Sequence, residues 1–127
     1  MYLKQFLIIG ALTCASAVAA GAFGAHGLKA VLSQASLNTY GTAVEYQFLH
    51  GFALIVSACL ANVINQKPNI WFCLSASLFC AGLILFCGSL YVLAFGGPSW
   101  FGPITPLGGL SFILAWCVFA CAIFKSP

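Results

Sequence analysis

The chain has 127 residues, of which 63% are apolar and 4% are charged, and its mean hydropathy is +1.10. Soluble domains carry about 25% charged residues, so this chain has too few polar groups to cover a surface in water. The composition therefore excludes a soluble enzyme, a disordered segment and a basic nucleic-acid-binding protein. We expect an integral membrane protein.

Four stretches are long and apolar enough to cross a membrane, because about 20 helical residues span a hydrocarbon core of about 30 Å. They run over residues 5–23, 45–64, 70–95 and 106–124. The first stretch resembles a secretory signal peptide, but its apolar run continues past the alanine-rich segment, so we predict a retained helix. Little chain lies outside the spans. We therefore predict one integral membrane domain, 1–127, with an all-α fold: a four-helix transmembrane bundle.

The links between the spans carry further signals. Between the first and second spans, apolar residues recur at i, i+3, i+4 and i+7, which favours a short amphipathic interfacial helix over an irregular loop. These residues are Leu28, Val31, Leu32 and Ala35. Thr105 followed by Pro106 is typical of the N-cap and first residue of the last helix. Lys4, Lys67 and Lys125 fall on one side and Lys29 on the other, which predicts that both termini are cytoplasmic.

Seven cysteines all lie inside apolar runs, where cysteine behaves as a small hydrophobic residue. Cys73, Cys80 and Cys87 recur at seven-residue steps and would share one helix stripe. If this stripe faced Cys117 and Cys121, the cysteines could hold a metal or form a redox pair. We favour the other interpretation, in which the cysteines are small residues that pack between helices. No CxxC pair is present. We predict no metal site and no cofactor.

Ionisable groups in membrane spans are costly, which makes each of them a candidate for function. Five polar residues gather where the first helix ends and the second begins: His26, Glu45, Tyr46, Gln47 and His50. Two interpretations remain open. In the first, Thr42-x-x-Glu45 is a capping box and the others are hydrogen-bonded packing. In the second, the five residues line a proton, ion or ligand pocket. No nucleophile–base pair is visible, so we predict no catalytic residue.

The motifs GAFGAHGLK (21–29), TAVEYQFLHGFAL (42–54), LILFCGSLYVLAFGG (83–97) and ITPLGGLSFILAWC (104–117) resemble the domain-of-unknown-function 423 family. This family of small bacterial inner-membrane proteins is similar to the eukaryotic transmembrane protein 256 group. The resemblance covers nearly the whole chain and implies four spans without a settled biochemical activity. By position, it singles out the following residues: Gly24, Ala25, His26 and Gly27; Glu45, Tyr46, Gln47 and His50; Gly88, Ser89, Leu90 and Tyr91; Thr105, Pro106, Gly108 and Gly109.

From these patterns we predict a non-enzymatic, multi-pass protein of the bacterial inner membrane. Its expected role is that of an accessory or scaffold protein, in the bilayer or in a membrane complex, because many small packing residues are present and motifs for chemistry are not. Its expected partners are membrane lipids, a second copy of the chain or another membrane protein, but not nucleic acid. The alternative is a small transporter, channel or ligand-binding protein that uses the polar pocket around His26, Glu45 and His50.

Overall fold

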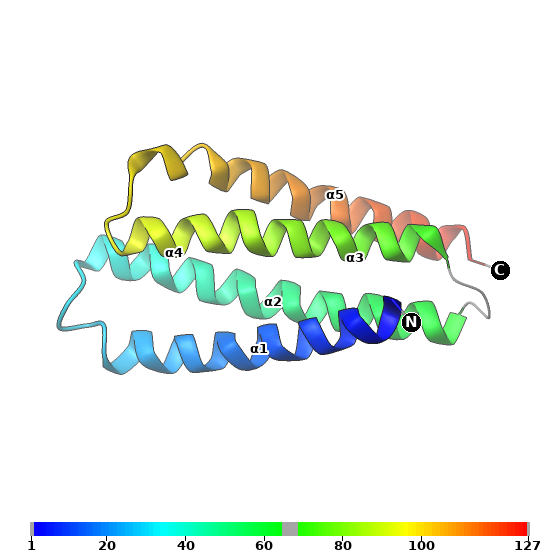
Figure 1. The fold of residues 1–127 in the computed structure, drawn as a ribbon, viewed down its shortest axis with the longest axis horizontal. Helices are drawn as coiled ribbons and strands as arrows, with labels where there is room; N and C mark the ends of the chain where they lie inside the picture. Colours follow the sequence, from blue (N-terminus) through cyan, green and yellow to red (C-terminus); the bar gives the residue numbers. More distant parts are fainter. Residues whose placement is uncertain (1, 65–68, 127) are drawn as a thin grey trace.

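The computed structural model describes residues 2–64 and 69–126, and these residues form a bundle of long helices (Figure 1). In chain order the elements are α1 (Tyr2–His26), α2 (Gln34–Ile64), α3 (Ile70–Gly82), the π-helical turn η1 (Leu83–Cys87), α4 (Gly88–Ala94), the 3-10 turn η2 (Ser99–Phe101) and α5 (Ile104–Phe124). Four stretches are long and apolar enough to cross a membrane: Leu3–His26, Gln34–Ile64, Ile70–Ala94 and Ser99–Phe124. The predicted all-α, four-span fold is confirmed.

The four spans lie side by side, with both termini at one end of the bundle and the α1–α2 and α4–α5 connections at the other (Figure 1). α1 packs mainly along α2, and α3 packs along α5, while α2 also contacts the third span, formed by α3, η1 and α4. α1 buries the smallest share of its surface of the four spans. The side of α1 that faces away from α2 is therefore exposed and is not covered by another described helix. Lys67, one of the lysines behind the predicted orientation, lies outside the described residues.

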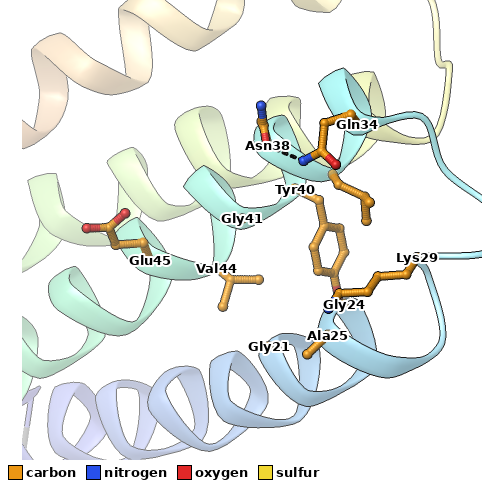
Figure 2. Close-up of a pocket in the computed structure, with 11 residues that line it drawn as sticks. Gly21, Gly24, Ala25, Lys29, Gln34, Asn38, Tyr40, Gly41, Val44 and Glu45 are labelled. Atoms are coloured by element: carbon orange, nitrogen blue, oxygen red, sulfur yellow. Dashed lines mark hydrogen bonds between the residues drawn. The ribbon is translucent and has the colours of Figure 1, made fainter.

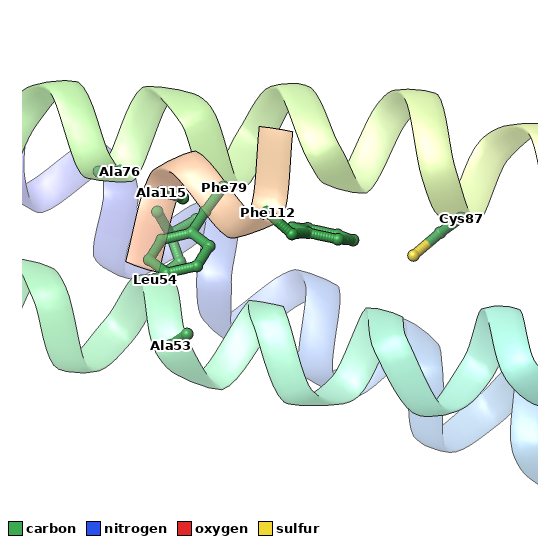
Figure 3. Close-up of a cluster of buried hydrophobic side chains, with 7 residues drawn as sticks. All are labelled: Ala53, Leu54, Ala76, Phe79, Cys87, Phe112 and Ala115. Carbon is green, nitrogen blue, oxygen red and sulfur yellow. The ribbon is translucent and has the colours of Figure 1, made fainter. Parts of the chain in front are cut away.

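The principal core joins α2, the third span and α5 near the middle of the bundle (Figure 3). Two phenylalanines fill it, Phe79 from α3 and Phe112 from α5. Small residues surround them and let the helix backbones approach closely, which is how helices associate in lipid. These are Ala53, Ala76 and Ala115, with Leu54 and Cys87 completing the cluster. Two serines add hydrogen bonds between α3 and α5: Ser75 Oγ donates to the carbonyl oxygen of Ala115 at 2.9 Å, and Ser111 Oγ to that of Leu78 at 2.8 Å.

The second span begins eleven residues earlier than predicted, at Gln34 instead of Glu45. Ser33 caps it, because its Oγ accepts from the Ser36 amide at 3.1 Å. The capping box expected at Thr42 and Glu45 does not form, since both residues lie inside the helix and Thr42 Oγ1 donates to the carbonyl oxygen of Asn38. A helix does not have to end where the hydrocarbon ends. Residues 34–44 are less apolar than the residues that follow them, so hydropathy does not show that the helix extends over them.

The expected interfacial helix is not a separate element. Only one hydrogen-bonded turn forms, in which the Leu32 amide donates to the carbonyl oxygen of Leu28 at 2.9 Å, and Ala35 already belongs to α2. The apolar pattern has another cause: Leu28 is buried and Leu32 packs beside it, against Tyr40 and Ala94 at this end of the bundle. Val31 is 75% exposed. The spacing of the apolar residues between the first two spans is therefore explained by contacts of Leu28 and Leu32 within the protein, and not by a helix that lies on the membrane.

The third span contains a π-helical turn that the sequence did not indicate, from Leu83 to Cys87. A π turn holds one extra residue, which rotates the following residues by about 100° relative to a continuous α-helix. Cys87 is therefore not in register with Cys73 and Cys80, and the predicted common stripe of three cysteines does not form. The span ends at Ala94, and Gly96, two residues later, has a φ of 76°, the left-handed conformation that glycine adopts after a helix.

The last helix starts at Ile104, so Thr105 is not its N-cap as predicted. Instead, Thr105 Oγ1 lies 2.7 Å from Ser89 Oγ of α4 and forms a hydrogen bond across the two spans. Pro106 falls within the first turn, where its missing amide costs no helical hydrogen bond. At the opposite end of the bundle, Asn69 caps α3 and the ammonium of Lys125 lies 3.8 Å above the Trp71 ring.

Candidate functional site

The polar residues of the second span point in three directions, because successive residues of an α-helix are turned by about 100°. Tyr46 and His50 face the third span and α5. Gln47 faces α1 and α4. Glu45 is exposed and lines a cleft between α1 and α2. The structure therefore does not bring the predicted site residues together in one pocket.

His50 lies in an aromatic enclosure and is 3% exposed. Its ring is stacked on Phe112, with 3.6 Å between ring centroids and 12° between ring planes. Trp116 Nε1 donates to His50 Nε2 at 3.4 Å, and His50 Nδ1 lies 2.9 Å from the carbonyl oxygen of Tyr46. Because Nε2 accepts, the ring hydrogen belongs on Nδ1, which donates to the carbonyl. This pattern assigns His50 as a neutral imidazole with both nitrogens in hydrogen bonds.

Gln47 joins three helices through its amide group. Its Oε1 accepts from the Tyr91 hydroxyl of α4 at 2.6 Å. Its Nε2 donates to Ser16 Oγ at 2.8 Å and to the carbonyl oxygen of Thr13 at 3.2 Å, both in α1. A cavity of about 240 Å³ lies beside this network, between α1 and the π turn. Because each polar atom of the amide is bonded within the protein, Gln47 acts here as a connector of helices.

A cleft of about 560 Å³ lies between the end of α1 and the first half of α2 (Figure 2). Its walls are mainly small or apolar: Gly21, Gly24, Ala25, Leu37, Tyr40, Gly41 and Val44. The Tyr40 ring crosses it and donates its hydroxyl to the carbonyl oxygen of Ala20 at 2.8 Å. Four polar side chains complete the lining: Lys29, Gln34, Asn38 and Glu45.

Lys29 and Glu45 occupy opposite ends of the cleft (Figure 2). The Lys29 side chain runs from the connection after α1 back toward Gly24 and the hydroxyl end of the Tyr40 ring. Neither charged group has an ion pair or hydrogen bond with any residue that the structure describes. Gln34 Nε2 donates to Asn38 Oδ1 at 3.0 Å, which leaves the other polar atom of each amide available. The cleft thus presents one cation, one anion and two amides.

His26 is the last residue of α1 and is exposed, and it is not part of the cleft lining. The cysteines also stay apart: all seven are free thiols, and Cys117 and Cys121 are exposed on α5. Within residues 2–64 and 69–126, no three histidine, cysteine, aspartate or glutamate side chains lie close enough to hold one metal ion. The predicted site residues are therefore divided between the His50 enclosure, the Gln47 network and the cleft, and His26 belongs to none of the three.

Comparison with known proteins identifies the family. Residues 20–109 match the family model described as protein of unknown function, DUF423. The chain belongs to this family. It is 40% identical over 123 residues to a UPF0382 membrane protein of Staphylococcus aureus, covering 97% of this chain and 98% of the relative. It is 39% identical to the UPF0382 membrane protein YwdK of Bacillus subtilis, with the same coverage, and 38% identical to a Haemophilus influenzae relative, covering 97% of this chain and 96% of that protein. No solved structure matches.

The family assignment confirms the resemblance stated from the motifs, and it confirms that the chain is a membrane protein. Sequence reasoning missed the roles of Tyr91 and Trp116, which complete the hydrogen bonds of Gln47 and His50 from other spans. In the sequence, Tyr91 stands out only as a position that matches the family, and no pattern singles out Trp116. Lys29 and Asn38 were missed as cleft residues because the extension of α2 was not recognised. Tyr91 carries a hydroxyl inside an apolar span, and this is the feature of the sequence that could have predicted a hydrogen bond to another span.

Proposed function

We propose that the protein is a non-enzymatic accessory subunit of the bacterial inner membrane, which presents α1 to a transmembrane helix of a partner protein. The observation that carries this proposal is the outer face of α1, which is exposed and rich in alanine. Ala11, Ala15, Ala19 and Ala22 recur there at steps of three and four residues. Helices associate in lipid where small residues allow close approach, whereas faces in contact with lipid need no such residues.

The use of the polar residues supports an accessory role over a catalytic one. The side chains that sequence analysis singled out inside the bundle are engaged in structural hydrogen bonds: Gln47 with α1 and α4, and His50 with Trp116 and its own helix. Buried groups that are already bonded stabilise one arrangement of helices. In this proposal, chemistry is performed by the partner, and this protein supplies a packing surface.

The proposed orientation places both termini in the cytoplasm. Lys4 and Lys125 lie at the end of the bundle that carries the termini, and Lys29 lies at the other end (Figure 1). Basic residues near the ends of spans remain preferentially on the cytoplasmic side. The α1–α2 cleft then opens toward the outer leaflet.

The proposal is tested by crosslinking in intact membranes. A photoreactive phenylalanine derivative is placed at Ala15, in the middle of the alanine face, and at Ile113, which is 61% exposed on α5, as a matched position. We expect a discrete protein adduct from Ala15 and only lipid adducts from Ile113. An Ala15→Leu substitution should abolish the association during purification in mild detergent, whereas Ala120→Leu, on the exposed side of α5, should not. A protein that is monomeric in every variant and yields no protein adduct refutes the proposal.

A further inference from the structure

The depth of Glu45 in the membrane follows from both helices that form the cleft. Residues 45–64 are the last twenty of α2 and cover about 30 Å, the thickness of the hydrocarbon core. On α1, Gly21 is at nearly the same level, because a Cβ at Gly21 would lie 3.4 Å from the side chain of Val44. Gly21 precedes the end of α1 at His26 by about 7–8 Å. Glu45 therefore lies close to the hydrocarbon boundary, at the end of the bundle that carries the α1–α2 connection.

Glu45 is the only acidic residue of the chain, and its carboxylate has no partner at this depth. It is exposed and forms no ion pair or hydrogen bond with any residue that the structure describes. Ionisable residues of transmembrane segments almost always face the interior of a bundle or a water-filled cavity, and they pair with other polar groups. Lys29 lies at the opposite end of the cleft, beyond the end of α1 (Figure 2). The exposed carboxylate therefore indicates that another molecule supplies a cation.

The alanine face of α1 leads to this carboxylate. Because each helical residue turns by 100°, four exposed residues of α1 fall within an arc of about 80°: Ala11, Ala15, Ala22 and Ala25. The last of them, Ala25, lines the cleft together with Glu45. A helix that packs along the alanine face therefore passes the cleft at the level of Glu45.

The cleft has room for a long side chain from such a helix. Its volume is about 560 Å³, and a Cβ at Gly41 would meet no atom within 4 Å. Its walls are mainly small or apolar, with Val44 beside Glu45. Lysine and arginine pack their methylene stems along apolar surfaces of this kind while their charged ends reach a polar group. Shape and charge of the cleft thus both suit a basic side chain.

We infer that the α1–α2 cleft receives a lysine or arginine side chain from a transmembrane helix of another protein, and that the cationic end of this side chain pairs with Glu45. The inference rests on the proposed function and adds to it the charge that the partner carries and the depth of that charge. A second copy of the chain in the same orientation does not supply the cation, because its Lys29 follows the end of α1, nearer the membrane surface than Glu45.

The test uses the photoreactive derivative at Ala15 in intact membranes, combined with substitutions in the cleft. Glu45→Gln preserves the shape of the side chain and removes its charge. We expect the ratio of protein adduct to free protein to fall about tenfold, the usual effect of losing one charge-assisted hydrogen bond. The thermal unfolding temperature should not change, because the carboxylate has no partner among the described residues. Lys29→Gln is the matched control in the same cleft and should leave the adduct ratio unchanged.

Mass spectrometry of the Ala15 adduct then identifies the partner helix. We expect it to carry a lysine or arginine whose replacement by glutamine gives the same tenfold loss. Glu45→Lys, combined with glutamate at that partner position, should restore most of the adduct.

An Ala15 adduct that forms equally well with Glu45→Gln would overturn this inference while the proposed function stands, whereas the absence of a protein adduct from every variant overturns both. The inference is also overturned by an adduct with a second copy of the chain, by a partner helix without a basic residue, or by an exchange of charges that restores nothing. A loss with Lys29→Gln as large as that with Glu45→Gln would show that the carboxylate pairs with Lys29 of its own chain, and would overturn it as well.

Discussion

Glycine-to-alanine substitution should have opposite effects on stability at two positions of the α1–α2 pair. Alanine stabilises a helix by about 0.5–1 kcal/mol relative to glycine. At Gly41 a Cβ meets nothing within 4 Å, so the whole gain should appear. At Gly10 a Cβ would lie 2.7 Å from Ile55 Cγ1 and 2.8 Å from the carbonyl oxygen of Gly51. Carbon atoms pack best at about 3.5–4.0 Å, so the helices would have to separate.

Such overpacking costs about 1–3 kcal/mol, and the obstacle at Gly10 includes backbone, which cannot rotate away. Subtracting the gain in helix propensity leaves an expected loss of up to about 2.5 kcal/mol for Gly10→Ala. Gly41→Ala should instead gain about 0.5–1 kcal/mol. The free energy of unfolding is measured in mixed micelles by titration with a denaturing detergent, followed by circular dichroism. A stabilising Gly10→Ala, or losses of equal size at both positions, would refute the close approach of α1 and α2 at Gly10.

Two further predictions concern the network and the orientation. In a double-mutant cycle, Tyr91→Phe and Gln47→Leu should show a coupling energy of about 0.6 kcal/mol, the average for hydrogen bonds between helices in lipid, and at most about 1.7 kcal/mol. Additive effects in the same unfolding assay would contradict the 2.6 Å contact between Tyr91 and Gln47. In a variant whose seven cysteines are replaced by alanine, Ser99→Cys should react with a membrane-impermeant maleimide in intact cells, and Ser126→Cys only after permeabilisation. The reverse labelling pattern would invert the proposed orientation.

The number of spans and their approximate positions could be predicted from the sequence, because each depends only on the residues of one helix. Four apolar stretches are sufficient to predict four spans, because the hydrocarbon core fixes the number of residues that each needs. The start of α2 could not be found in the same way, because hydropathy locates the edge of the hydrocarbon and not the end of a helix. Ser33 is a good N-cap, yet Thr42 is equally good by residue type, and only the packing of Leu37, Tyr40 and Val44 against the end of α1 distinguishes them.

The candidate site was harder to predict because its residues meet across spans. A helix projection separates Glu45 from His50 correctly by about 140°, but it does not say which neighbour each residue faces. Trp116 lies 66 positions from His50, and Tyr91 lies 44 from Gln47, so no local pattern joins them. The charge of Glu45 is enough to single it out, and the residue does line the cleft between α1 and α2. That Lys29 lines the same cleft could not be predicted without knowing the course of the connection between α1 and α2.

The π turn also determines how the third span tolerates changes in length. α3 bonds with α5 through Ser75, whereas α4 bonds with α2 through Tyr91 and with α5 through Ser89. Removing one residue from 83–87 would restore continuous α-helical hydrogen bonding, but it would turn α4 by about 100° and shorten the span by about 1.5 Å. Tyr91 would then point away from Gln47. Natural homologues should therefore preserve the number of residues between these two sets of contacts even where the side chains differ.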